Sequence, residues 1–183
     1  MLRYTSYDIV FQEIPGEITL AINISNCPNH CEGCHSPHLQ EDTGEILTES
    51  TLSLLLENYG NAITCICFMG GDNSPEEVLN LAQFIRRGAI HRAQYTHPAP
   101  PIKTAWYSGS SQLYKNAQHG FDYIKLGEYI EELGGLDSPK TNQRLYKIIN
   151  GKMVDMTNHF IKEKFSKYMK RINYLNATDI KKN

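Results

Sequence analysis

Short apolar segments of strand length alternate with helical patterns along the middle of the chain, and this alternation restricts the fold most. Expected strands cover residues 18–24, 62–69, 102–107 and 121–126. Helical patterns follow the first two of these strands, and a short helix is expected near residues 112–118. Strands that alternate with helices are typical of a parallel sheet. We therefore expect an α/β fold with parallel strands and outer helices.

The two longer helices carry start signals that fix their positions. Thr48 can cap a helix that ends at Gly60, with an apolar stripe on its inner face. Ser74 precedes Pro75, and Glu77 stands three residues after Ser74. This pattern predicts a helix whose first turn is closed by a capping box between Ser74 and Glu77.

The carboxyl-terminal part of the chain predicts a hairpin and a basic tail. Residues 144–149 and 152–156 flank Asn150-Gly151, a strong two-residue turn signal. From residue 157 onward, seven Lys and Arg stand against two acidic residues, whereas the whole chain of 183 residues has a net charge of −2. We expect one domain over residues 1–156 and a helical or partly disordered tail over 157–183. The tail is either a solvated end or a docking arm for an acidic partner surface.

Each unusual motif comes directly after an expected strand. Three cysteines follow the first strand, Gly70-Gly71-Asp72 the second and Ser108-Gly109 the third, while Lys125 lies at the end of the fourth. The carboxyl ends of parallel strands share one edge of a sheet, where binding sites of α/β folds are built. We therefore expect these motifs to meet in space.

The spacing of the three cysteines indicates a metal centre. Cys27, Cys31 and Cys34 place three thiols within eight residues. Iron–sulfur clusters are held by cysteine thiolates, usually four, and three ligands leave one iron open for a substrate. Two alternatives stay open on spacing alone: zinc with a histidine as fourth ligand, or inert thiols. His30, His35 and His38 are the histidines near enough in sequence to complete a zinc site.

The other candidate residues have less specific signals. Gly70 and Gly71 permit a positive φ and a close approach of a ligand to the backbone, and Asp72 can accept a hydrogen bond from a ligand ammonium. Ser108 is a candidate for a ribose or carboxylate, and Lys125 for a carboxylate. Cys65 and Cys67 share one face of an apolar strand, so we expect both to be core residues rather than ligands.

Composition and charge exclude some classes of protein. The near-neutral charge favours neither a nucleic acid nor a membrane surface as partner. No signal peptide and no apolar run long enough for a transmembrane helix is present. We expect a cytoplasmic location, where cysteines are mostly thiols or metal ligands.

These motifs together resemble the radical S-adenosylmethionine superfamily. Within it, residues 26–36 (NCPNHCEGCHS) resemble the cluster loop of the activating proteins of anaerobic ribonucleoside-triphosphate reductases. Residues 68–72 (FMGGD), 104–109 (TAWYSG) and 122–127 (DYIKLG) resemble the strand ends that follow in that family. The resemblance covers residues 2–158.

The resemblance implies a partial (β/α) barrel, a [4Fe–4S] cluster and S-adenosylmethionine as cofactors. It implies an oxidoreductase of the glycyl-radical-activating class, in which a 5′-deoxyadenosyl radical takes a hydrogen from a glycine of the reductase. The reductase catalytic subunit and an electron donor such as flavodoxin or ferredoxin are the implied partners. The implied metal ligands are Cys27, Cys31 and Cys34; the implied cofactor contacts are Gly33, His35, Gly70, Gly71, Asp72, Ser108 and Lys125.

Two departures and two rival functions accompany the resemblance. Gly33 stands where many superfamily members carry an aromatic residue, and Asp72 replaces the more frequent glutamate. The first rival is a radical enzyme that acts on a small molecule or peptide. The second is a zinc-binding adaptor without catalytic activity. The cofactors supply the chemistry in the implied mechanism, so no protein acid, base or nucleophile is expected.

Overall fold

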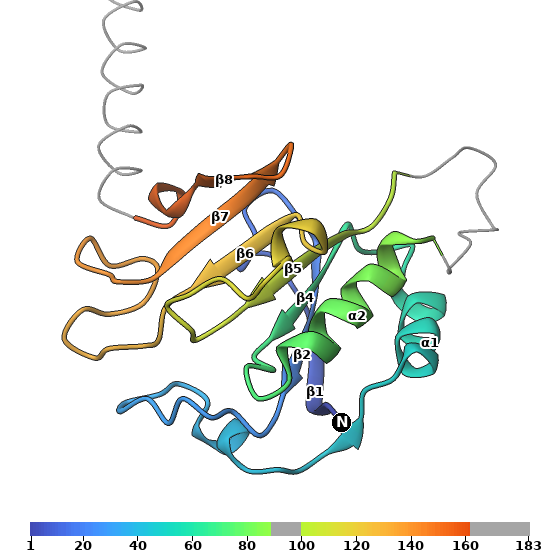
Figure 1. Cartoon of the computed structure of the whole chain (residues 1–183), viewed down its shortest axis with the longest axis horizontal. Coiled ribbons are helices and arrows are strands. Elements are labelled where there is room, and N and C mark those ends of the chain that lie inside the picture. The colour runs from blue at the N-terminus through green and yellow to red at the C-terminus, as the bar shows by residue number, and fades with distance from the viewer. Residues whose placement is uncertain (89–99, 162–183) are drawn as a thin grey trace, which may run out of the picture.

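One mixed sheet of eight strands organises the part of the chain that the computed structural model describes, residues 1–88 and 100–161 (Figure 1). The sheet order is β3-β1-β2-β4-β5-β6-β7-β8, so β3 and β8 are its edges. The fold is mixed α/β, with an open and partly parallel sheet and two α-helices in this part of the chain. The strands are β1 (Arg3–Val10), β2 (Thr19–Ile24), β3 (Glu45–Ile46), β4 (Cys65–Met69), β5 (Lys103–Tyr107), β6 (Tyr123–Leu126), β7 (Arg144–Ile149) and β8 (Lys152–Asp155).

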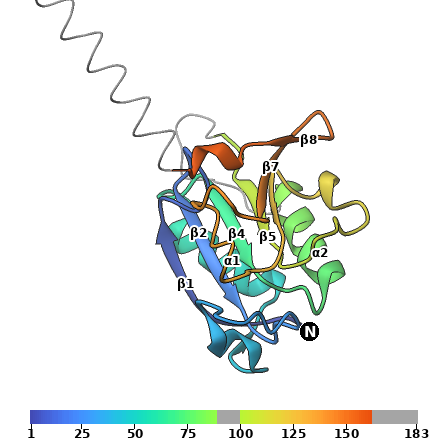
Figure 2. The same cartoon turned by 90° about the vertical axis from the view of Figure 1, so that its left-hand side faces the viewer.

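Four neighbouring strands, β2, β4, β5 and β6, are parallel, which confirms the expected parallel core. One row of side chains crosses all four, with Ile22 opposite Phe68, Phe68 opposite Trp106 and Trp106 opposite Ile124. The flanking strands run antiparallel: β1 pairs with β2 and β3, and β7 pairs with β6 and β8. Figure 2 shows β1, β2 and β4 side by side, seen from another direction.

Both helices pack on one face of the sheet. α1 (Glu49–Tyr59) and α2 (Pro75–Arg86) bury apolar stripes against side chains of β2, β4, β5 and β6 (Figure 1). Alternation along the strands sends the remaining small side chains, such as Cys65, Cys67 and Ala105, to the opposite face. A second cluster therefore forms there with Ile14 and Leu145.

The helix boundaries agree with the predictions, but one capping prediction is wrong. Thr48 caps α1, since its Oγ1 accepts a hydrogen bond from Thr51 N at 3.1 Å. The Ser74 side chain makes no capping hydrogen bond. The Glu77 carboxylate instead accepts a hydrogen bond from Leu2 N at 2.8 Å, so the start of the chain uses the group that a capping box needs.

Short turns replace one expected helix. Residues 112–118 do not form a helix as predicted; a 3₁₀ turn, Ala117–His119, is all that is present there. Asn116 has φ +65°, and this left-handed conformation interrupts any helix through the segment. Two more 3₁₀ turns are Pro37–Gln40 and Thr157–His159.

The carboxyl-terminal hairpin is confirmed. β7 and β8 pair antiparallel, and the turn residues Asn150 and Gly151 have φ values of +51° and +73°. The predicted basic tail lies outside the described residues from position 162 onward. None of the described helices is both long and apolar enough to cross a membrane.

Candidate functional site

The predicted meeting of the strand-end motifs is present in the structure. The cysteine loop leaves β2, the Gly-Gly-Asp turn leaves β4, and Ser108 and Gly109 follow β5. Because these strands are parallel and in register, the loops share one edge of the sheet. We call this the carboxyl edge.

Asp72 joins three of the motifs. Its Oδ2 accepts hydrogen bonds from Asn29 Nδ2 at 2.8 Å and from Gly109 N at 2.7 Å. Its Oδ1 accepts one from Ser108 Oγ at 2.5 Å. A carboxylate offers about four acceptor positions, so three donors leave about one for a ligand. The half-buried carboxylate is therefore held in place without being saturated.

The predicted site residue Ser108 is 1% exposed, and the protein itself uses its hydroxyl. The hydroxyl donates to Asp72 and also accepts a hydrogen bond from Ser110 N at 3.0 Å. Its place in the site is therefore one of orienting Asp72.

Lys125 lies beneath the same loops and is 8% exposed. Its Nζ donates to the backbone oxygens of Gly127 at 2.5 Å and Ser108 at 3.4 Å. An ammonium has three donors, so these two bonds leave one donor unused.

The electrostatics of Lys125 tie it to the cysteine loop. Burial lowers the pKa of Lys125 to about 8, although the charges of Asp72, Cys31, Cys27 and Cys34 act to raise it. The same cation therefore acts on all three predicted metal ligands and on Asp72.

The cysteine loop is anchored at its two ends and open in the middle. Asn26 N donates to Glu41 O, and Cys27 N donates to Leu39 O, both at 2.9 Å. The predicted ligands Cys27, Cys31 and Cys34 are free thiols and half-buried.

Two of these thiols accept hydrogen bonds, from Asn29 Nδ2 to Cys27 Sγ at 3.7 Å and from Ser36 N to Cys34 Sγ at 3.4 Å. N–H groups that point at cysteine sulfur tune iron–sulfur clusters. The chemistry of this donor set therefore suits thiolate ligation. Over the described residues, no group of three or more His, Cys, Asp or Glu side chains is arranged to hold a single metal ion.

The two glycines of the turn have different surroundings. Gly70 and Gly71 have φ values of +100° and +88°, which side chains disfavour. A Cβ on Gly71 would lie 2.5 Å from Val78 Cγ2, so this side of its α-carbon packs against the core. Gly70 O accepts a hydrogen bond from Trp106 Nε1 at 2.8 Å. The turn is thus built into the core, and Asp72 is the part of it that faces the other motifs.

Gly33 and His35 lie on the exposed side of the cysteine loop, under a segment that follows β6. A Cβ on Gly33 would be 3.1 Å from Glu131 Oε2. The His35 ring lies 4.7 Å from the Tyr129 ring, between centroids.

A cavity of about 1120 Å³ opens beside this edge. Cys34, His35 and Lys125 contribute to its wall, together with Tyr107 and Tyr129. Pockets for small ligands typically measure about 300–1,000 Å³, so this one can hold a cofactor and part of a second reactant. A smaller cavity of about 290 Å³ also has Tyr129 in its wall and is lined by Cys31.

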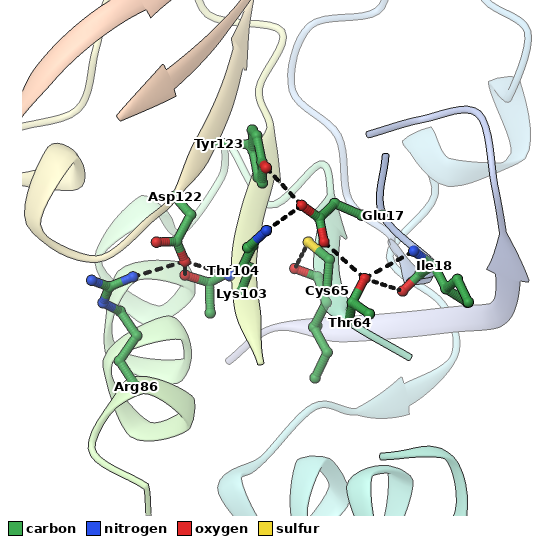
Figure 3. Close-up of polar contacts among 10 residues, drawn as sticks. Glu17, Ile18, Thr64, Cys65, Arg86, Lys103, Thr104, Asp122 and Tyr123 are labelled. Carbon is green, nitrogen blue, oxygen red and sulfur yellow. Dashed lines mark hydrogen bonds and ion pairs between the residues drawn. The ribbon is translucent and has the colours of Figure 1, made fainter. Parts of the chain in front are cut away.

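A second polar cluster occupies the opposite, amino edge of the parallel strands and was missed from the sequence (Figure 3). Glu17 is 7% exposed, and its carboxylate accepts hydrogen bonds from Lys103 Nζ at 2.5 Å, Tyr123 Oη at 2.7 Å and Thr64 Oγ1 at 2.8 Å. Asp122 lies nearby and pairs with Arg86 at 2.8 Å. We call this group the Glu17 cluster.

Cys65 and Cys67 are core residues, as predicted, and both are fully buried. Burial raises the pKa of each thiol well above its usual value. Neither is therefore suited to act as a thiolate ligand.

Sequence reasoning missed Asn29 and Tyr129. Asn29 bonds both Asp72 and Cys27, and its place inside the cysteine loop was the signal available for it. No local sequence pattern marks Tyr129, because its neighbours in space depend on how the segment after β6 folds back.

Comparisons with protein-family models, curated proteins and solved structures gave no significant match.

Proposed function

We propose that this chain is a radical S-adenosylmethionine activase that generates a glycyl radical on an anaerobic ribonucleoside-triphosphate reductase. In this proposal the four parallel strands, with α1 and α2 outside, form the incomplete barrel of that superfamily. The open sheet and the one-sided placement of the helices are compatible with this reading.

The observation that supports this proposal most strongly is the hydrogen bond between Asn29 and Asp72, at 2.8 Å. It joins a loop of three free thiols to a Gly-Gly-acid turn that is 43 residues away in sequence. A loop that only held a structural metal has no need for a partly unsatisfied carboxylate beside it.

The residues present suit both proposed cofactors. Cys27, Cys31 and Cys34 would hold a [4Fe–4S] cluster, and its open iron would bind S-adenosylmethionine. Asp72 would accept a hydrogen bond from the methionyl ammonium, and the unused donor of Lys125 would serve the carboxylate. When bound, the two cofactors supply reductive cleavage to a 5′-deoxyadenosyl radical.

The protein's own contribution is orientation and the exclusion of water. Asn29, Ser108 and Gly109 hold the Asp72 carboxylate in one direction, so a ligand ammonium meets a preset acceptor. Lys125 is held from below by two backbone oxygens. Such preorganisation places the reactive end of the cofactor with little loss of entropy at the moment of reaction.

The proposed substrate is a glycine of the reductase, and the proposed electron donor is a flavodoxin or ferredoxin. The cavity beside the cysteine loop has room for a polypeptide loop next to a cofactor. The same volume suits a small-molecule substrate, which is the second candidate.

An anaerobic assay with electron paramagnetic resonance tests the proposal. The reconstituted protein should bind about four irons, and reduction should yield 5′-deoxyadenosine. With the reductase present, the spectrum should show the doublet of a glycyl radical. This doublet should be absent when the reductase's radical glycine is changed to alanine. If the protein bound one zinc ion per chain and took up no iron, this result would contradict the proposed activase function. Cofactor cleavage that consumes an added small molecule, without a protein radical, would favour the second candidate.

A further inference from the structure

Asn29 lies inside the cysteine loop, and its amide joins two different acceptors. The amide nitrogen Nδ2 donates to Asp72 Oδ2 at 2.8 Å and to Cys27 Sγ at 3.7 Å. A primary amide carries two N–H bonds, so one donor is available for each acceptor. A carboxylate and a metal-bound thiolate both carry negative charge, and such groups accept stronger hydrogen bonds than neutral ones. The amide therefore bridges the cysteine loop and the Gly-Gly-Asp turn.

The end of β5 holds the space for this amide. A Cβ on Gly109 would lie 2.2 Å from Asn29 Nδ2 and 2.9 Å from Asn29 Cγ. Gly109 is not one of the glycines with a positive φ, so its backbone conformation suits any residue. Close packing against the Asn29 amide is therefore the reason that a side chain is disfavoured at position 109.

The two hydrogen bonds to cysteine sulfur in this loop differ in kind. The donor to Cys34 Sγ is the backbone N–H of Ser36, at 3.4 Å, which most substitutions leave in place. The donor to Cys27 Sγ is the side chain of Asn29. Reduction adds negative charge to an iron–sulfur cluster, so a donor to a ligating sulfur favours the reduced state and raises the reduction potential. Asn29 is thus a side chain through which the sequence can set this potential.

We propose that Asn29 is a positioning residue that sets two properties of the site at once. Through Cys27 it raises the reduction potential of the cluster, and through Asp72 it orients the acceptor of the methionyl ammonium. The inference rests on the proposed function, which supplies the cluster and the ammonium. Because one amide serves both acceptors, the two properties change together when this amide is removed or displaced.

Two measurements on anaerobically reconstituted protein test the proposal: a redox titration of the cluster and equilibrium dialysis of S-adenosylmethionine. Asn29→Ala loses a donor to each acceptor. It should shift the equilibrium of one-electron reduction about fivefold toward the oxidised cluster, which is about 40 mV at about 59 mV per tenfold. It should also weaken S-adenosylmethionine binding about fivefold.

Ser108→Ala is the matched control for the redox measurement. The Ser108 hydroxyl donates to Asp72 at 2.5 Å and accepts from Ser110 N, and its bonds go to these groups rather than to a sulfur. Its loss should weaken S-adenosylmethionine binding but leave the potential unchanged.

Gly109→Ala displaces the amide without removing it. The added methyl group should push Asn29 away from both acceptors and so lower both the potential and the cofactor affinity. In the double variant Asn29→Ala/Gly109→Ala the space is free, so the second substitution should add less than about twofold to either effect. A general loss of packing would instead add to the effect of Asn29→Ala.

The outcomes separate the role of Asn29 from the proposed function. An unchanged potential in Asn29→Ala, an equal shift in Ser108→Ala, or additive effects in the double variant each overturn the inference and leave the activase standing. If Asn29→Ala takes up no iron, Gly109→Ala decides by the same two measurements: both effects together support the inference, and either effect alone overturns it. An unmodified protein that takes up no iron overturns both proposals.

Discussion

The two edges of the parallel strands carry similar polar groups but use them differently. At the amino edge, the Glu17 carboxylate is almost fully buried and bonded to Lys103, Tyr123 and Thr64. At the carboxyl edge, Asp72 also accepts three hydrogen bonds from the protein, but it is half-buried and bonds the loop that carries three free thiols. A deeply buried carboxylate that is paired with a lysine stabilises the fold, whereas a half-buried carboxylate beside free thiols can still meet a ligand cation.

The largest expected effect distinguishes a cysteine at the carboxyl edge from a cysteine in the core. Changing Cys34 to Ala should abolish iron uptake and the broad visible absorption, because a cluster ligand is lost. Changing Cys67 to Ala should leave iron content unchanged and lower the free energy of unfolding by about 1 kcal/mol, the cost of a small cavity. Iron analysis and urea unfolding measure both. Retained absorption in Cys34→Ala would remove that thiol from the site.

Variants of Asp72 test whether the charge of this carboxylate or only its geometry matters for cofactor binding. Asp72→Asn can still pair with Asn29, Ser108 and Gly109, but it loses the negative charge. It should weaken S-adenosylmethionine binding roughly tenfold or more, since a hydrogen bond to a charged group contributes about 1.5–3 kcal/mol. Asp72→Ala should bind more weakly still, with iron retained in both. Normal binding by Asp72→Asn would show that no cation meets this carboxylate.

Glu17 tests whether the amino edge serves stability alone. Glu17→Ala leaves the Lys103 ammonium and the Tyr123 hydroxyl without their acceptor. We expect the free energy of unfolding to fall by about 3 kcal/mol. Iron content and cofactor affinity should stay unchanged. Thr64→Val removes the hydroxyl that donates to Glu17 and accepts from Ile18 N but keeps the pair between Glu17 and Lys103, so it should cost less and is the matched control. A drop in cofactor affinity with unchanged stability would reverse the roles of the two edges.

The smallest expected effect is a pH dependence from Glu17. Burial acts to raise the pKa of Glu17, but hydrogen bonds from Lys103, Tyr123 and Thr64 outweigh it and hold the pKa below its usual value. A lowered folded-state pKa stabilises the fold above the unfolded-state value of 4.5, and the contribution is lost as pH falls through the folded-state pKa. The stability gap between the unmodified protein and Glu17→Gln should therefore narrow below about pH 4.5. Urea unfolding from pH 7 to pH 3 measures it, and a constant gap would contradict it.

Local signals in the sequence predicted much of the fold. Thr48, Pro75 and Asn150-Gly151 act within a few residues, and the two helices and the hairpin follow from them. The meeting of the motifs followed from strand order, since parallel strands place their ends together. The capping box at Ser74 was wrong because Glu77 bonds Leu2, a distant residue.

The parts that could not be predicted depend on long-range partners. Glu17 and Tyr123 are 106 residues apart, and no local pattern marks either as a polar core residue. The contact of Asn29 with Asp72 needs the exact course of an irregular loop. Tyr129 reaches the site because Asn142 and Gln143, which come just before β7, hold its segment.

The tight turn between β7 and β8 has a consequence for how the chain refolds. Hairpins with two-residue turns form in about 1–10 μs. The parallel pairs join residues that are roughly forty positions apart, such as Thr19 with Cys65 and Cys65 with Lys103, and closing such loops is slow. In a denatured chain returned to water, we expect the hairpin to form before the parallel strands associate. β6 then has a ready partner in β7, so its outer edge spends little time exposed to other molecules. Pulse-labelled hydrogen exchange during refolding should show protection first in β7 and β8.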